Sequence, residues 1–157
     1  MPENTPDTRP AMNALRYHTG NDLDLDQVIA LYRASTLGER RPVDDREAMA
    51  AMLRHANLVV TAWNGDQLVG IARTLTDFAY VGYLSDLAVH SDFQRAGIGK
   101  ELIRRTREQM GPKARIVLLA APAAVDYYPR IGFTRHTSAW VLQGTDPFPG
   151  TAPDHKD

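Results

Sequence analysis

Residues 80–110 constrain the fold of this chain more than any other stretch. Residues 80–89 are rich in aromatic and aliphatic side chains, which favours a buried strand. A short polar loop leads to Gly97-Ile98-Gly99-Lys100, and apolar residues then recur at helical spacing until Gly111-Pro112, a typical helix stop. A strand, a glycine-rich turn and a helix therefore follow one another directly.

This turn is predicted to bind an anion. A helix N-terminus leaves about four backbone N–H groups without intrahelical partners and carries about half a positive charge. Gly97 and Gly99 lack the side chains that would keep a phosphate away from those groups, while Arg95 and Lys100 add positive charge beside them. We therefore expect a phosphate or pyrophosphate as the ligand.

Two well-known phosphate-binding turns do not fit the sequence. A P-loop needs Ser or Thr directly after its lysine, but Glu101 follows Lys100. A dinucleotide-binding turn needs a third small residue where this chain has Leu102. It also needs an acidic residue at the end of the next strand, where Ala121-Pro122 stands.

A third pattern fits. The run Gln94-Arg95-Ala96-Gly97-Ile98-Gly99, preceded by Leu87-Ala88-Val89, resembles the pyrophosphate loop of the GNAT superfamily of N-acetyltransferases, which use acetyl-CoA. Further along, Tyr128 stands four residues before Gly132-Phe133, as in the short helix of that family. The resemblance covers residues 15–142 and implies acetyl-CoA as cosubstrate, without a metal. The residues that it implies for cofactor binding are Leu87, Ala88, Val89, Gln94, Arg95, Ala96, Gly97, Ile98, Gly99 and Lys100.

Acetyl transfer to an amine needs a proton acceptor and a proton donor. An amine with a pKa of about 10 is mostly protonated at neutral pH, and a departing thiolate, with a reference pKa of about 8.5, must take up a proton. The resemblance implies that Tyr128 is this donor, acting as a general acid. The alternative is that Tyr128 packs its short helix onto the sheet, a role we expect for its neighbour Tyr127.

The proton acceptor has two candidates. Several GNAT enzymes carry a glutamate on the central strand where this chain has Tyr83, which makes Tyr83 a candidate for the base position or for a wall of the acceptor pocket. Asp86 is the other candidate base, with a structural role as the alternative. A water chain as proton acceptor, or an acceptor that arrives already neutral, also stays open. Strict alternation puts Asp86 on the face opposite Tyr83, unless the strand contains a bulge. The family's usual asparagine before the short helix is missing, since Ala121-Pro122 stands there.

The other segments complete an α/β (α+β) GNAT fold. Helices are expected after an N-cap at Asp22 or Asp24 and after one at Asp44, and Asn64-Gly65-Asp66 predicts a hairpin. Residues 116–120 should return as a parallel strand, and residues 133–137 and 139–142 should add one or two more strands. The expected sheet is mixed, mostly antiparallel and six- to seven-stranded, with about four helices on both its faces.

The ends and the polar segments complete the domain prediction. Residues 1–13 and 143–157 hold six of the ten prolines and are expected to be flexible tails around a domain of residues 14–142. In GNAT proteins the connection between the first two helices commonly forms a wall of the acceptor site. Residues 35–43 are therefore expected either to form that wall or to be a solvated loop.

Composition excludes several classes of function. The 18 basic and 19 acidic residues argue against a general nucleic-acid or membrane-surface binder. No apolar run has the length of a membrane span, and the N-terminus does not look like a signal peptide, so we expect a cytoplasmic protein. The chain has no cysteine, which excludes a disulfide, a thiolate zinc site and an acetyl-cysteine intermediate, and its five histidines are scattered.

The sequence thus predicts an acetyl-CoA-dependent N-acetyltransferase that transfers acetyl directly to a primary amine. Polyamines, amino sugars, amino acids and protein amines all stay open as acceptors, and the lack of a charged tract favours a small molecule. The alternative is a GNAT-like domain that binds acyl-CoA and regulates without turnover. Homodimers are common in the family, and no residue of this chain decides for or against one.

Overall fold

The computed structural model describes residues 14–150. The chain divides into two compact units between Leu119 and Ala120. The first unit contains the sheet and its helices, and the second contains short helical turns and a long irregular segment. The expected extent of the folded domain, residues 14–142, stays a prediction.

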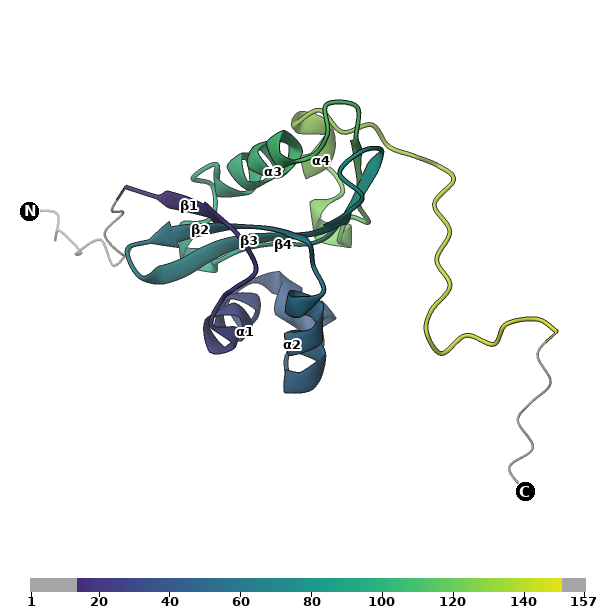
Figure 1. Cartoon of the computed structure of the whole chain (residues 1–157), viewed down its shortest axis with the longest axis horizontal. Coiled ribbons are helices and arrows are strands. Elements are labelled where there is room, and N and C mark those ends of the chain that lie inside the picture. The colour runs from purple at the N-terminus through teal and green to yellow at the C-terminus, as the bar shows by residue number, and fades with distance from the viewer. Residues whose placement is uncertain (1–13, 151–157) are drawn as a thin grey trace, which may run out of the picture. The chain divides into compact units, whose positions relative to one another are not determined.

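The first unit is built on one five-stranded sheet (Figure 1). In sheet order the strands are β1 (Arg16–Thr19), β2 (Leu58–Asn64), β3 (Gln67–Thr76), β4 (Val81–Val89) and β5 (Arg115–Val117). The first four strands are antiparallel and β5 runs parallel to β4, as predicted. The hairpin between β2 and β3 is also confirmed, and Gly65 takes the positive φ of 60° that its turn requires.

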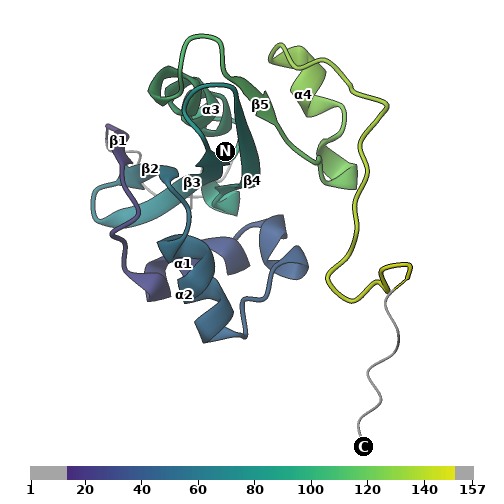
Figure 2. The ribbon, with the colours of Figure 1, turned by 45° about the vertical axis from the view of Figure 1, so that its right-hand side comes forward.

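Helices cover both faces of this sheet. Helix α1 (Leu25–Arg33) and helix α2 (Arg46–Arg54) lie on one face, and α3 (Ile98–Gln109) lies across the sheet from them (Figure 2). Asp24, one of the two predicted caps, caps α1 by accepting hydrogen bonds from the N–H groups of residues 26 and 27. The cap of α2 is Asp45, not Asp44 as expected, because Asp44 pairs with Arg33 instead, at 2.8 Å.

The core between the sheet and the α1–α2 layer is formed by apolar residues that recur at helical spacing. Met49, Leu53 and Ala56 are buried there, together with Val28 and Tyr32 of α1. Burying a side chain the size of Val28, Met49 or Leu53 contributes about 1.5–3 kcal/mol. This layer therefore holds one face of β3 and β4 in place.

On the other face, Gly70 of β3 lets α3 approach closely. A Cβ atom at residue 70 would lie 2.9 Å from Ile98 Cγ2 and 3.1 Å from Leu102 Cδ1. We expect Gly70→Ala to lower the free energy of unfolding by about 1–3 kcal/mol through overpacking. Urea unfolding checks this, with Gly144→Ala as the control, because a Cβ there meets nothing within 4 Å. Equal unfolding of the two variants would contradict the prediction.

The strand count differs from the expected six to seven. In the described residues β5 has three residues, and neither residues 133–137 nor 139–142 form a strand. Strand propensity alone does not make a strand, because the backbone must also find a partner edge. Within residues 14–150, β5 is the only strand that follows β4, and it pairs with β4 over a short ladder. The second unit contains η3 (Pro122–Ala124), α4 (Tyr127–Arg130) and an irregular segment in which Trp140 is 94% exposed.

Candidate active site

The sheet opens beside the middle of β4. The parallel ladder with β5 ends at the pair Tyr83 and Val117, whereas β4 continues to Val89 along β3. From residue 84 onward, the edge of β4 that faces away from β3 has no strand partner within the described residues. Backbone groups on such an edge can bind an extended ligand as a strand would. Leu87, Ala88 and Val89, which the sequence assigned to cofactor binding, lie on this open part of β4.

The glycine-rich turn lies after the end of β4 and begins α3. Gly97 is the N-cap of α3, with a φ of 77°, and no side chain caps the helix. Arg95 also has a positive φ, 67°, and successive N–H groups in such turns form concave anion sites. Phe93 and Ile98 are buried on either side, so the exposed turn between them is anchored at both ends.

Charge around this turn favours an anion. Arg95 and Lys100 are exposed beside the free N–H groups. Glu101 stands in the first turn of α3, where its carboxylate could compete with a bound anion. Instead it pairs with Arg104 at 2.7 Å and Arg105 at 2.8 Å. Hydrogen bonds from Arg104 and then Arg105 hold the pKa of Glu101 at about 2.

These features fit the pyrophosphate of acetyl-CoA. The N-terminus of α3 has no side-chain cap, and a Cβ atom at residue 97 would meet nothing within 4 Å, so the approach to the turn is open. A pyrophosphate needs such unpaired N–H groups and nearby positive charge. Gln94, Ala96 and Gly99 complete the turn that the sequence assigned to this group.

A bulge in β4 places Asp86 on the face covered by α1 and α2. Asp86 is opposite Arg73 in the register with β3, but the next pair is Leu84 with Thr74, so Ser85 is the additional residue. The bulge reverses the alternation beyond it. Asp86 therefore shares a face with Tyr83, and the possibility of a bulge raised by the sequence is realised.

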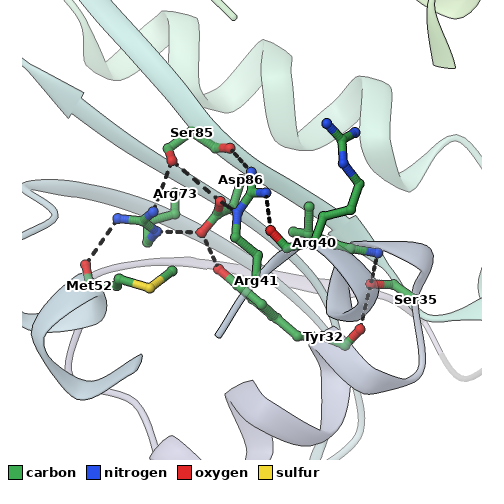
Figure 3. Close-up of polar contacts among 9 residues, drawn as sticks. Tyr32, Ser35, Arg40, Arg41, Met52, Arg73, Ser85 and Asp86 are labelled. Carbon is green, nitrogen blue, oxygen red and sulfur yellow. Dashed lines mark hydrogen bonds and ion pairs between the residues drawn. The ribbon is translucent and has the colours of Figure 1, made fainter. Parts of the chain in front are cut away.

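The carboxylate of Asp86 is the centre of a buried polar cluster (Figure 3). Arg73 Nε donates to Oδ2 at 2.5 Å, and the Tyr32 hydroxyl donates to the same oxygen at 2.6 Å. Arg41 Nε donates to Oδ1 at 2.6 Å, and the Ser85 hydroxyl donates to it at 3.3 Å. The side chain of Asp86 is fully buried, and these four donors occupy its acceptor positions.

This environment makes Asp86 a poor general base. Burial raises the pKa of Asp86, but the hydrogen bond and charge of Arg73, with the bonds from Tyr32 and Arg41, outweigh burial and hold the pKa below its usual value. The contact with Asp86 also shifts the pKa of Arg73. Burial lowers the pKa of Arg73, but the hydrogen bond to Asp86 outweighs burial, so the pKa is raised. A carboxylate with a lowered pKa and four donors takes up a proton only with difficulty. The geometry fits the structural alternative for Asp86.

Tyr83 stands where the sheet opens. It pairs with Leu75 on β3 and forms the last rung of the parallel ladder with Val117. All three side chains are partly exposed, at 40–44%. This position is compatible with a wall of an acceptor pocket.

Tyr128 belongs to the second unit and lies in α4. Its ring makes edge-to-face contacts with Tyr127 and Phe133, with centroids 5.4 Å apart in each case. Burial, with a smaller effect of Tyr127, raises the pKa of Tyr128. The phenol therefore keeps its proton throughout the neutral range, as a proton donor must before the reaction.

Sequence reasoning missed the partners of Asp86. One signal was present: Arg73 stands within an apolar strand, and a buried guanidinium needs a carboxylate, of which Asp86 is the one in β4. Arg41 had no such signal, because it follows η1 (Thr36–Arg40) in a polar loop. No group of three or more metal-binding side chains is gathered in residues 14–150, and no helix in that range is long and apolar enough to cross a membrane.

An open strand edge followed by an uncapped helix N-terminus is an arrangement that can bind an elongated anionic ligand. The family model described as an acetyltransferase (GNAT) domain matches residues 33–149. The chain belongs to the GNAT acetyltransferase family.

Individual relatives agree with this assignment. The chain is 31% identical over 101 residues to an uncharacterized ycf52-like N-acetyltransferase of Prochlorococcus marinus, covering 60% of this chain and 54% of that protein. The chain spans about half the length of the curated relatives it matches.

Solved structures share the fold. A protein of Deinococcus radiodurans R1 provisionally named an acetyltransferase aligns with a TM-score of 0.71 and 22% identity, over 87% of this chain and 93% of that one. The aminoglycoside N-acetyltransferase AAC(6')-Iy, solved with CoA, aligns with a TM-score of 0.65 and 16% identity, over 84% of this chain and 95% of that one.

Proposed function

We propose that this chain is an acetyl-CoA-dependent N-acetyltransferase that transfers acetyl directly to a primary amine of a small molecule. The observation that carries the proposal is that the unpaired edge of β4 is followed along the chain by the uncapped N-terminus of α3. The edge has backbone groups for an extended arm, and the helix end has N–H groups for a pyrophosphate. One elongated ligand with both parts, such as acetyl-CoA, would use both features.

The residues of the chain have separate parts in this proposal. Bound acetyl-CoA supplies an activated acetyl group; overall, an N–C bond forms, an S–C bond breaks and one proton passes from the amine to the thiolate. Backbone N–H groups near Leu87 to Val89 would stabilise an oxyanion in a water-poor cleft. Tyr128 would donate its proton to the departing thiolate as general acid, and the proton that the amine loses would restore the Tyr128 phenol. Tyr83 would form part of the acceptor wall. Because Asp86 is already bonded to four donors, we assign no side chain as base and propose that the acceptor reacts as a neutral amine.

The rival function is a domain that binds acyl-CoA without turnover. One observation favours it: β4 offers no free carboxylate, because the only acidic side chain of that strand is Asp86. The presence of Tyr128 at the family position favours the enzyme instead. The two functions share the cofactor site and differ in turnover.

Calorimetric titration with acetyl-CoA, followed by a thiol-release assay, tests both functions. The amines to be tried are spermidine, glucosamine, lysine, an aminoglycoside and a peptide with a free N-terminus. Binding with thiol release above the rate without amine supports the enzyme and identifies the acceptor class. Binding without release on all five supports the rival, and no binding contradicts both.

Replacing Tyr128 by phenylalanine is expected to lower kcat by about tenfold to a hundredfold, with a modest loss of cofactor affinity. The variant loses the hydroxyl that would protonate the thiolate but keeps the ring contacts, and general acids contribute about this much or more. Because the pKa of Tyr128 is raised, wild-type kcat should fall only above about pH 10, where the phenol loses its proton.

Steady-state rates from pH 6 to 10.5 check this prediction. Tyr127→Phe is the matched control, since Tyr127 is the adjacent, more exposed ring and should tolerate the change. A rate for Tyr128→Phe equal to wild type across this pH range would make Tyr128 a packing residue.

A further inference from the structure

Arg41 ties a surface connection to the centre of the sheet. It follows η1 in the segment that joins α1 to α2. Its guanidinium reaches Asp86 Oδ1 through Nε at 2.6 Å, and the Ser85 carbonyl oxygen through Nη2 at 2.8 Å. Nη1 donates to the carbonyl oxygen of Arg40, also at 2.8 Å. All three guanidinium nitrogens are thus engaged, one of them at the bulge of β4 (Figure 3).

Neutralising Asp86 does not require Arg41. Arg73 lies opposite Asp86 in the register of β3 and β4 and already compensates its charge, and the Tyr32 hydroxyl adds a further donor. With Arg41, two guanidinium groups share one buried carboxylate. Bringing a second guanidinium to this carboxylate costs additional desolvation, although Arg73 already compensates the charge of Asp86. Charge balance therefore does not explain the contact of Arg41.

The position of the contact offers a better explanation. The Ser85 carbonyl belongs to the part of β4 that lies beyond the last rung with β5, where the sheet is open. A different contact fixes the start of the segment between α1 and α2. There Gly38 packs closely against the carbonyl oxygen of Tyr32, near the end of α1. Arg41 is partly exposed, with 23% of its side chain accessible, whereas Arg73 is nearly buried at 9%. Arg41 therefore links a partly exposed segment both to the buried carboxylate and to the backbone of β4 beyond the ladder with β5.

We propose that Arg41 is a positioning residue for the acceptor. By binding Asp86 and the Ser85 carbonyl, it holds residues 39–43 beside the open edge of β4, where this segment forms one wall of the acceptor site. The inference rests on the proposed function, because only a transferase has an acceptor. It assigns a role to the segment that the sequence left open between an acceptor wall and a solvated loop.

Two variants isolate this contact. Arg41→Ala removes it but leaves Asp86 with Arg73 and Tyr32, so the fold should persist. Arg40→Ala is the matched control, because Arg40 is adjacent, exposed and directed away from the Asp86 carboxylate (Figure 3). Arg41→Lys keeps the charge but loses the planar fork, and it should restore the wild-type values only in part.

Hydrogen exchange and steady-state kinetics on the full chain provide the readouts. In Arg41→Ala we expect the backbone amides of this segment, those of Glu39, Arg40, residue 41 and Val43, to exchange about tenfold faster or more, because charge-assisted bonds that restrain local opening are lost. With the best amine of the five named above, KM for that amine should rise about tenfold, while KM for acetyl-CoA changes less than about twofold. Residues 94–100, which would bind the pyrophosphate, are not touched by the substitution. Arg40→Ala should match wild type in every measurement.

The outcomes separate this inference from the proposed function. Unchanged exchange in Arg41→Ala overturns the positioning role whatever the kinetics show. Faster exchange with unchanged KM for the amine overturns the acceptor wall, and equal rises in KM for both substrates would make Arg41 a general structural residue. If wild type acetylates none of the amines, the proposed function fails and the acceptor role fails with it, while exchange still decides whether Arg41 holds the segment.

Discussion

Replacing Gly97 by glutamate is expected to abolish coenzyme A binding while leaving most of the fold intact. Gly97 caps α3 with a φ of 77°, and no side chain competes for the N–H groups of the first turn. A glutamate there would add a carboxylate to that turn, where it would repel a pyrophosphate and occupy the same N–H groups. We expect Kd for acetyl-CoA to rise at least about a hundredfold, which corresponds to about 2.8 kcal/mol.

A second variant separates charge from backbone strain. A side chain at a left-handed position costs about 1–2 kcal/mol of stability for most residues, but asparagine adopts this conformation more readily. Gly97→Asn should therefore keep the turn without the negative charge and lose much less affinity. Calorimetry gives Kd, and far-UV circular dichroism with urea unfolding reports the fold. If Gly97→Glu binds acetyl-CoA as tightly as wild type, the turn is not the pyrophosphate site.

Replacing Asp86 by asparagine is expected to lower the free energy of unfolding by about 3–5 kcal/mol, as breaking buried ion pairs usually does. The change keeps the size of the side chain, so no cavity forms. It removes the charge that compensates Arg73 and Arg41, and Arg73 is buried. The asparagine amide also places a donor where the carboxylate accepted hydrogen bonds.

The pH dependence gives this prediction a second test. Because the pKa of Asp86 is lowered in the folded state, its stabilisation is fully present above the unfolded value of about 3.9 and is lost as the pH falls through the folded value. The difference in unfolding free energy between wild type and Asp86→Asn should be constant from pH 5 to 8 and shrink below about pH 4.

Urea unfolding at several pH values measures the difference. Asp44→Asn is the control, since its pair with Arg33 is exposed and such pairs contribute little. A loss in Asp86→Asn no larger than in this control would show that the cluster does not stabilise the fold. A difference that grows toward low pH would contradict the assigned ionisation of Asp86.

Local sequence was sufficient for the elements around the glycine-rich turn. Gly97 supplies the left-handed cap of α3, and the buried Ile98 and Leu102 follow the predicted helical stripe. Asp24 caps α1 because a short carboxylate before a helix bonds the N–H groups just after it, and such contacts span only a few residues. The cap of α2 could not be chosen from local sequence, because Asp44 and Asp45 are adjacent and either could cap the helix. The contact of Asp44 with Arg33 leaves Asp45 as the cap.

By itself, the sequence determined the order of the main elements, the antiparallel start of the sheet, the parallel return and the glycine-rich turn that begins α3. These features depend on side-chain periodicity, short connections and backbone preferences, all of which act within a few residues. Only the tertiary structure decided the bulge at Ser85, the burial of Asp86 between two arginines and the length of β5. Each of these depends on which backbone edge or charged group a distant segment brings into contact: Arg41 lies 45 residues from Asp86 in the chain, and the hydrogen bond between them forms only once the fold has brought them together.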